Sequence, residues 1–171
     1  ALDVVCPNFM PLEAFMVLPE KPRTVLALDG VTNPQNVGMI IRSAVAAGVD
    51  GLLYPKRGIA SLGPLVIKAS AGNIFRAPII RCDSTVSAVN ALKAKGYQVA
   101  TLEATATTSL FEFTAADNLV CVLGGESDGI GQEVTALADT RLTIPMANGV
   151  ESLNVAVTAA LVSFHLGQTP D

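Results

Sequence analysis

Apolar strand-like runs alternate with helix-like segments along almost the whole chain, and this alternation restricts the fold more than any other feature. The apolar runs occupy residues 24–29, 51–55, 77–82, 97–103, 118–126 and 141–145. Segments with helical spacing or capping signals lie between and after them, at residues 36–48, 62–72, 83–96, 131–138 and 152–166. Strands that are apolar throughout and alternate with helices predict an α/β fold with a parallel sheet covered by helices on both faces.

The regular pattern predicts one folded domain over residues 23–171, and a chain of 171 residues suits a single domain. Residues 1–22 contain four prolines and no clear period. We expect this stretch to lie outside the domain, as the remnant of a linker from a removed N-terminal region. The longest apolar run, residues 155–164, is well short of the roughly 20 residues that cross a bilayer. We therefore expect no membrane segment and a location in the cytoplasm or an organelle matrix.

Two residue types that often carry chemistry are scarce. His165 is the sole histidine, and the cysteines, at positions 6, 82 and 121, are widely spaced. A Ser-His-Asp or Cys-His nucleophile system therefore lacks a base, and no His/Cys metal site can be assembled. We expect buried thiols and no metal, so that any catalysis must use Arg, Asn, Ser and carboxylate side chains.

Charge is unevenly divided along the chain. The net charge is −4, but ten of the eleven Lys and Arg lie within residues 1–95, which leaves +4 there and −8 in residues 96–171. Two interpretations are open: a chance distribution, or a basic surface that faces a polyanion. The candidate residues for such a surface are Lys56, Arg57, Lys68, Arg76 and Arg81.

Ligands of open α/β sheets collect at the carboxyl ends of the strands, so the loops after strands are the places to search for a site. The first such loop contains Asn33, Gln35 and Asn36, and Arg42 follows on an otherwise apolar helix. Arg42 either extends to water or meets an anion. Asn36 is either a simple N-cap or part of a site.

The second loop is glycine-rich, with the sequence "VLGGESDGIG" at residues 122–131. Its spacing matches neither GxGxxG nor GxxxxGK[ST], and Glu126 and Asp128 would repel phosphate. The loop therefore suits a ligand with a neutral or cationic face, unless it is an ordinary connector.

The third loop has the sequence "IPMANGVESLNVAV", residues 144–157, and joins a short strand to the last helix. Asn148-Gly149 indicates a tight turn, and Ser152 is predicted to cap the helix. Asn154 would then lie one or two positions inside the helix, where its amide competes with the backbone. Asn154 is thus either a buried structural tie or part of a site.

Taken together, the three loops resemble a known enzyme family. "NPQNVGMIIRSAVAAGV", "VLGGESDGIG" and "IPMANGVESLNVAVTAAL" are similar to the three ordered motifs of the SpoU (TrmH-type) RNA ribose 2′-O-methyltransferases of the SPOUT superfamily. The resemblance extends from about residue 24 to residue 166. It implies a parallel α/β sheet whose C-terminal segment threads through a loop to form a deep trefoil knot, an exception to the rule that folds are unknotted.

The resemblance also implies a cofactor, S-adenosylmethionine, held where the second and third motifs meet. The positions implied for its binding are Gly124, Gly125, Ile144, Met146 and Leu153. The positions implied for catalysis are Asn36, Arg42, Glu126, Ser152 and Asn154.

Family members act as homodimers on RNA, so the resemblance implies a homodimer and an RNA substrate, with rRNA ranked before tRNA. Arg42 and Asn36 match the residues that activate the ribose hydroxyl and bind nearby phosphate. A guanidinium normally stays protonated, so Arg42 as a base would need a strongly perturbed site. The alternative to an active enzyme is a paralogue that binds the cofactor and serves as an RNA-binding or assembly module without turnover.

Overall fold

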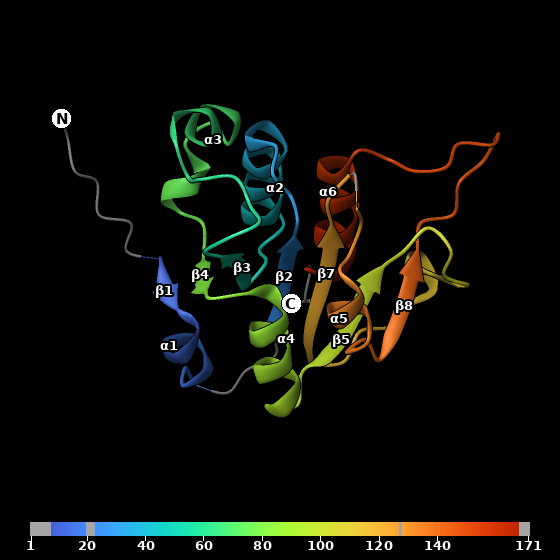
Figure 1. Cartoon of the computed structure of the whole chain (residues 1–171), viewed down its shortest axis with the longest axis horizontal. Coiled ribbons are helices and arrows are strands. Elements are labelled where there is room, and N and C mark those ends of the chain that lie inside the picture. The colour runs from blue at the N-terminus through green and yellow to red at the C-terminus, as the bar shows by residue number, and fades with distance from the viewer. Residues whose placement is uncertain (1–7, 20–22, 127, 168–171) are drawn as a thin grey trace.

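The computed structural model describes residues 8–19, 23–126 and 128–167. Within these residues one eight-stranded sheet runs through the molecule in the order β1-β4-β3-β2-β7-β5-β8-β6, and all paired strands are parallel (Figure 1). The strands are β1 (Met10–Pro11), β2 (Arg23–Asp29), β3 (Gly51–Pro55), β4 (Ile79–Cys82), β5 (Gln98–Leu102), β6 (Thr108–Ser109), β7 (Asn118–Gly124) and β8 (Thr140–Thr143). The predicted parallel α/β sheet is confirmed.

Helices cover both faces of the sheet, as predicted. They are α1 (Leu12–Met16), α2 (Pro34–Ala46), α3 (Pro64–Ala69), α4 (Thr85–Ala94), α5 (Gln132–Thr135) and α6 (Val155–Leu166), with short 3-10 turns η1 (Asn73–Phe75) and η2 (Leu110–Glu112). Leu26 and Leu28 of β2 pack in one core with α2, α3 and α6, whereas Val25 and Ala27 pack in a second core with α1, α4 and α5. This alternation follows from the two-residue period of a strand. The trefoil knot stays a prediction.

Two expected helix starts are wrong, because polar side chains cap the helices at other positions. The last helix begins at Val155, and Asn154 is its N-cap, with Oδ1 accepting from the Ala156 N–H at 2.9 Å. Ser152, predicted as that cap, lies in the preceding loop. Similarly, α2 begins at Pro34 with Asn33 as its N-cap. Asn36 is therefore inside the first turn and is not a cap.

Part of the N-terminal segment joins the sheet. Met10 and Pro11 of β1 pair with Ile80 and Arg81 of β4, and Phe15 of α1 is buried in the second core. The boundary predicted at residue 23 stays a prediction. Cys82 and Cys121 are buried, as predicted, and burial raises their pKa values to about 11 and about 12. Cys6 lies outside the described residues.

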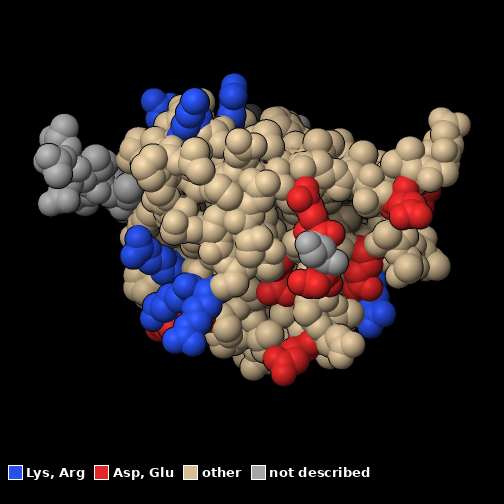
Figure 2. All heavy atoms as spheres, turned by 45° about the horizontal axis from the view of Figure 1, so that its top comes forward, with Lys and Arg blue, Asp and Glu red and all other residues tan. Residues whose placement is uncertain are grey.

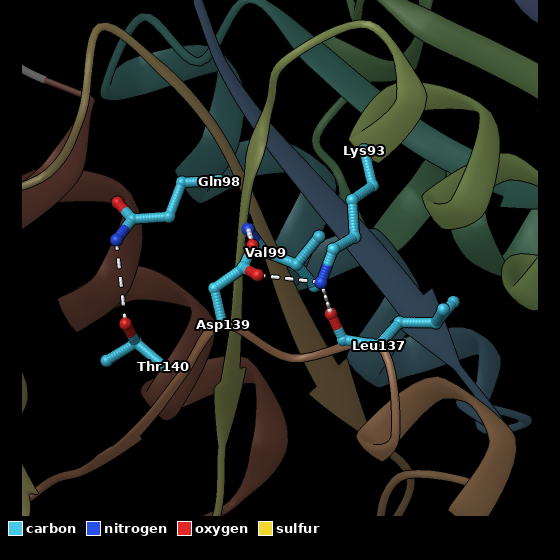
Figure 3. A network of polar contacts seen from close by, with 6 residues as sticks. All are labelled: Lys93, Gln98, Val99, Leu137, Asp139 and Thr140. Carbon is cyan, nitrogen blue, oxygen red and sulfur yellow. Dashed lines mark hydrogen bonds and ion pairs between the residues drawn. The ribbon is translucent and has the colours of Figure 1, made fainter.

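A polar network anchors the beginning of β8 beside β5 (Figure 3). Asp139 accepts from the Val99 N–H at 2.8 Å and from Lys93 Nζ at 2.6 Å, and Lys93 also donates to the Leu137 carbonyl at 2.7 Å. These bonds connect the end of α4, the edge of β5 and the turn before β8. They thereby position the strand that leads into the third loop.

Candidate functional site

Three polar side chains from the three loops meet at the carboxyl end of the sheet. Glu126 Oε1 accepts from Asn36 Nδ2 at 3.0 Å and from Asn154 Nδ2 at 2.7 Å. Asn154 Nδ2 also lies 3.2 Å from Asn36 Oδ1. Residues that are 90 and 118 positions apart in the chain thus form one hydrogen-bonded triad of Asn36, Glu126 and Asn154.

The chemistry of Glu126 determines how the two amides are turned. A carboxylate only accepts, so both Asn side chains must present Nδ2 to it. Asn154 then directs Oδ1 to the Ala156 N–H and caps α6. One asparagine therefore satisfies the helix terminus and the triad together, which accounts for this residue type at position 154. Asn36 is buried within α2, where an unpaired amide would be costly.

Asp29, at the end of β2, holds the glycine-rich loop in place. Its carbonyl accepts from the Gly125 N–H at 2.8 Å, and its Oδ2 accepts from the Gly131 N–H at 2.8 Å. A Cβ on Gly124 would lie 2.3 Å from the Gly129 carbonyl carbon, and one on Gly125 would lie 2.2 Å from the Gly30 oxygen. These two glycines are therefore required for close packing of the loop against itself and against the chain after β2.

A pocket of about 680 Å³ opens beside the triad. All five residues implied for cofactor binding line it, namely Gly124, Gly125, Ile144, Met146 and Leu153. Glu126, Ser152 and Asn154 line it as well. Asn36 touches this group through Glu126, whereas Arg42 is exposed on α2 and is not among the lining residues. The structure thus brings nine of the ten implied residues into one region and leaves Arg42 on the adjoining helix surface.

The pocket combines apolar walls with negative charge. Leu102, Leu123 and Leu153 supply apolar surface, and three carboxylates, Glu103, Glu126 and Glu151, also line it. This combination fits a ligand with an apolar part, hydroxyl groups and a positive charge, and the volume lies within the range of small-molecule sites.

Sequence reasoning missed Asp29 and Glu103. Glu103 accepts from Thr101 Oγ1 at 2.7 Å and lies 3.8 Å from Arg141 Nε, and both contacts use Oε1. Both acids lie at the carboxyl ends of apolar strands, where ligands of open α/β sheets bind. Their positions in the sequence could therefore have identified them as candidates.

The described parts of the chain contain neither a metal site nor a membrane-spanning helix. Residues 8–19, 23–126 and 128–167 contain no group of three His, Cys, Asp or Glu side chains arranged to hold a metal ion. None of the helices described is both long enough and apolar enough to span a bilayer.

Comparison with known proteins identifies the family. Residues 23–164 match the model of the SpoU rRNA methylase family. A curated relative from Staphylococcus saprophyticus, assigned to the TrmH family of tRNA/rRNA methyltransferases, is 38% identical over 147 residues. That alignment covers 86% of this chain and 59% of the relative. The chain therefore spans about three fifths of the length of this relative.

Solved structures agree with the sequence match. The SpoU methyltransferase AviRb from Streptomyces viridochromogenes, solved in complex with the cofactor AdoMet, has a TM-score of 0.78 at 25% identity, covering 92% of this chain and 64% of AviRb. A structure described as an RNA 2′-O ribose methyltransferase has a TM-score of 0.75 at 26% identity, covering 86% of this chain and 56% of that one. With its three motifs joined in the triad beside the pocket and this match over most of its length, the chain belongs to the SpoU rRNA methylase family.

Proposed function

We propose that this chain is an RNA methyltransferase that uses S-adenosylmethionine to methylate a ribose 2′-hydroxyl, with rRNA as the first substrate to test. The observation that carries the proposal is the meeting of the three motif loops in the Asn36–Glu126–Asn154 triad beside one pocket. The family match and the AdoMet complex of AviRb support the cofactor, and the similar 2′-O ribose methyltransferase structure supports the acceptor atom.

The pocket residues fit this cofactor by their chemistry. Ile144, Leu102 and Leu153 offer apolar surface for the adenine ring, and the carboxylates lining the pocket favour hydroxyl groups and positive charge. S-adenosylmethionine, when bound, supplies a methyl group that its sulfonium makes electrophilic. The triad fixes the relative position of the glycine-rich loop, α2 and the start of α6, so the pocket and the adjoining helix surface keep one geometry.

Arg42 is assigned to the RNA. It lies on the same helix as Asn36, is exposed, and has no ion pair among the described side chains. A guanidinium stays charged near neutral pH, so Arg42 binds the phosphate next to the target ribose and stabilises the developing alkoxide. Its contribution is to align the hydroxyl with the methyl donor.

A homodimer is part of the proposal. Val157, Leu161 and Phe164 lie along one side of α6, and Met39 is exposed on the neighbouring α2. Val157 and Phe164 are each about half exposed, at 49% and 48%. A stripe of large apolar side chains on two adjacent helices favours burial against a second copy.

The acceptor atom is the decisive measurement. The purified chain is incubated with labelled S-adenosylmethionine and rRNA, the product is digested to nucleosides, and the position of the label is read by mass spectrometry. We expect a methyl group on ribose, and a single deoxynucleotide at the target should abolish transfer because the 2′-hydroxyl is absent. A methylated base on an unmodified sugar would contradict the proposed chemistry. Cofactor binding without transfer to any RNA would favour the non-catalytic module.

Arg42→Ala provides the variant for the same assay. We expect turnover to fall about 100-fold or more while cofactor affinity stays near wild type, because Arg42 acts on the RNA and the transition state. Arg42→Lys should not rescue turnover, since an ammonium lacks the planar fork of a guanidinium. Near-normal turnover in Arg42→Ala would remove Arg42 from the mechanism.

A further inference from the structure

Charge is segregated around the proposed site. Acidic side chains gather about the glycine-rich loop and the pocket: Asp29, Glu103, Glu126, Asp128, Glu133 and Glu151. Figure 2 shows acidic side chains clustered on one part of the surface in view and most of the visible Lys and Arg side chains on other parts of it. A polyanion that approaches the triad is repelled by the acidic side chains and attracted by the basic ones.

Two basic side chains, Lys68 and Arg76, lie on and shortly after α3, the helix that packs against the helix of Arg42. Helix α3 packs directly against α2, since a Cβ on Gly38 would lie 2.4 Å from Ala69 Cβ and 2.9 Å from the Ser70 nitrogen. Arg42 follows Gly38 by about one helical turn, on the same side of α2. Lys68 is exposed on α3, and Arg76 is exposed directly after η1.

Arg57 extends this group toward the carboxyl end of the sheet. It is exposed in the loop that leads from β3 to α3. The same loop contacts the chain after β2, because the Ala60 N–H donates to the Val31 carbonyl at 3.2 Å. The loop that carries Arg57 is therefore tied to the loop that precedes Asn33 and Asn36.

These cations have no acidic partner, unlike three other basic residues of the described chain. Lys56 pairs with Asp83, Lys93 with Asp139, and Arg141 lies near Glu103. Within the described parts of the chain, Arg42, Arg57, Lys68 and Arg76 have no ion pair. Like charges on one surface repel one another, and the binding of a polyanion relieves this repulsion.

Apolar side chains are interleaved with these cations. Leu65 is 57% exposed one turn before Lys68, and Phe75 is 38% exposed next to Arg76. An exposed aromatic ring beside phosphate-binding cations is typical of single-stranded RNA sites, where bases stack on the ring. We define the α3 surface as Arg57, Leu65, Lys68, Phe75 and Arg76.

We propose that the α3 surface binds the phosphodiester chain of single-stranded substrate RNA next to the target nucleotide, with one base stacked on Phe75. This inference rests on the proposed function and adds the path of the RNA: from the triad past Arg42 and across α3, away from the glycine-rich loop. The sequence offered five basic residues as candidates for a surface that faces a polyanion, and three of them, Arg57, Lys68 and Arg76, belong to the α3 surface. Lys56 and Arg81 lie instead along a separate groove that also contains Glu13 and Asp83, which compensate their charge.

The test compares charge reversals of equal size. Lys68→Glu and Arg76→Glu are measured against Lys95→Glu, an exposed lysine at the end of α4 on the opposite face of the sheet. The probe is a fluorescein-labelled, mixed-sequence, single-stranded RNA of about 20 nucleotides, titrated with each protein at several salt concentrations. We expect Lys68→Glu and Arg76→Glu each to weaken binding about tenfold and to reduce the salt slope by about 0.7, with Lys95→Glu within twofold of wild type.

Phe75→Leu separates stacking from charge while keeping the buried part of the side chain apolar. We expect RNA affinity to fall about fivefold or more with an unchanged salt slope, because a stacked base releases no counterion. S-adenosylmethionine affinity, measured by calorimetry, should stay at wild-type level in all four variants.

The outcomes distinguish the two proposals. Equal binding by Lys68→Glu, Arg76→Glu and Lys95→Glu, or no binding of the RNA by the wild-type chain at low salt, would overturn the α3 surface. A wild-type chain that methylates rRNA together with either result would leave the proposed function intact. Loss of RNA binding in the α3 variants alone supports the α3 surface. The proposed function is tested separately, and it fails if the wild-type chain transfers no methyl group to RNA.

Discussion

At the scale of single residues, Glu126 has two roles: it connects the two asparagines of the triad, and its carboxylate forms part of the pocket wall. Glu126 accepts both asparagine amides through one oxygen, Oε1, and its carboxylate also lines the pocket. A glutamine at this position keeps an acceptor oxygen and loses the charge. The two roles of Glu126 can therefore be separated by mutation.

We predict that Glu126→Ala lowers the free energy of unfolding by about 1–3 kcal/mol, because it leaves the buried Asn36 amide without its acceptor. Glu126→Gln should cost about 1 kcal/mol or less, while weakening the binding of the cationic cofactor. Urea unfolding and calorimetry measure the two effects. Equal destabilisation by both variants would mean that the charge, and not the acceptor geometry, holds the triad together.

At the scale of secondary-structure elements, the short strand β8 depends on side-chain anchoring. It has four residues. Asp139, directly before the strand, accepts hydrogen bonds from Lys93 of α4 and from the Val99 N–H of β5. The hydrogen bond from Lys93, and then that from the Val99 backbone, hold the pKa of Asp139 below its ordinary value of 3.8. The charged form of Asp139 therefore stabilises the folded state.

The lowered pKa predicts a pH dependence. The stabilisation by Asp139 is fully present above pH about 4 and is lost as the pH falls through the lower pKa of the folded state. Asp139→Asn should therefore be less stable than wild type by about 1 kcal/mol at pH 6, and the difference should shrink toward pH 3. Urea unfolding at both pH values measures this. Asp83→Asn is the control, because its ion pair with Lys56 is largely exposed and its loss should leave stability unchanged.

At the scale of the whole molecule, the two proposed binding surfaces lie on either side of α2. Helix α2 lies between α3 and α6 (Figure 1). We propose that the apolar stripe of α6 binds a second copy of the chain and that the α3 surface binds RNA. An interface through α6 would leave the α3 surface exposed on each subunit.

We predict a homodimer whose interface buries more than about 1,000 Å² in total. Val157→Asp and Phe164→Asp should each shift the protein to a monomer, because each places a charge in the apolar stripe. Val17→Asp is the matched control, since Val17 is exposed beyond α1, away from this stripe. Light scattering at micromolar concentrations measures the mass. A monomeric wild type would contradict the prediction, as would dimers that survive both stripe substitutions.

Periodicity and loop chemistry in the sequence were enough to predict the parallel sheet, the helices on its two faces and the three loops that carry the site. These features are local: an apolar run such as residues 24–29 indicates a buried strand wherever it pairs. The resemblance of the motifs implied residues that bind the cofactor, including Ile144 and Leu153; these line the pocket, and their binding of the cofactor stays a prediction.

The tertiary structure alone decided where α6 begins and which atoms meet. Asn154 caps the helix in place of Ser152, because its amide also binds Glu126 from a loop 28 positions away. Asp29 and Glu103 lie at strand ends that the sequence indicates, but their partners Gly131 and Arg141 come from segments distant in the chain. Local propensity ranks Ser152 and Asn154 almost equally as caps, and the long-range hydrogen bond from Asn154 to Glu126 has no local signal. Such choices depend on contacts that exist only in the folded chain.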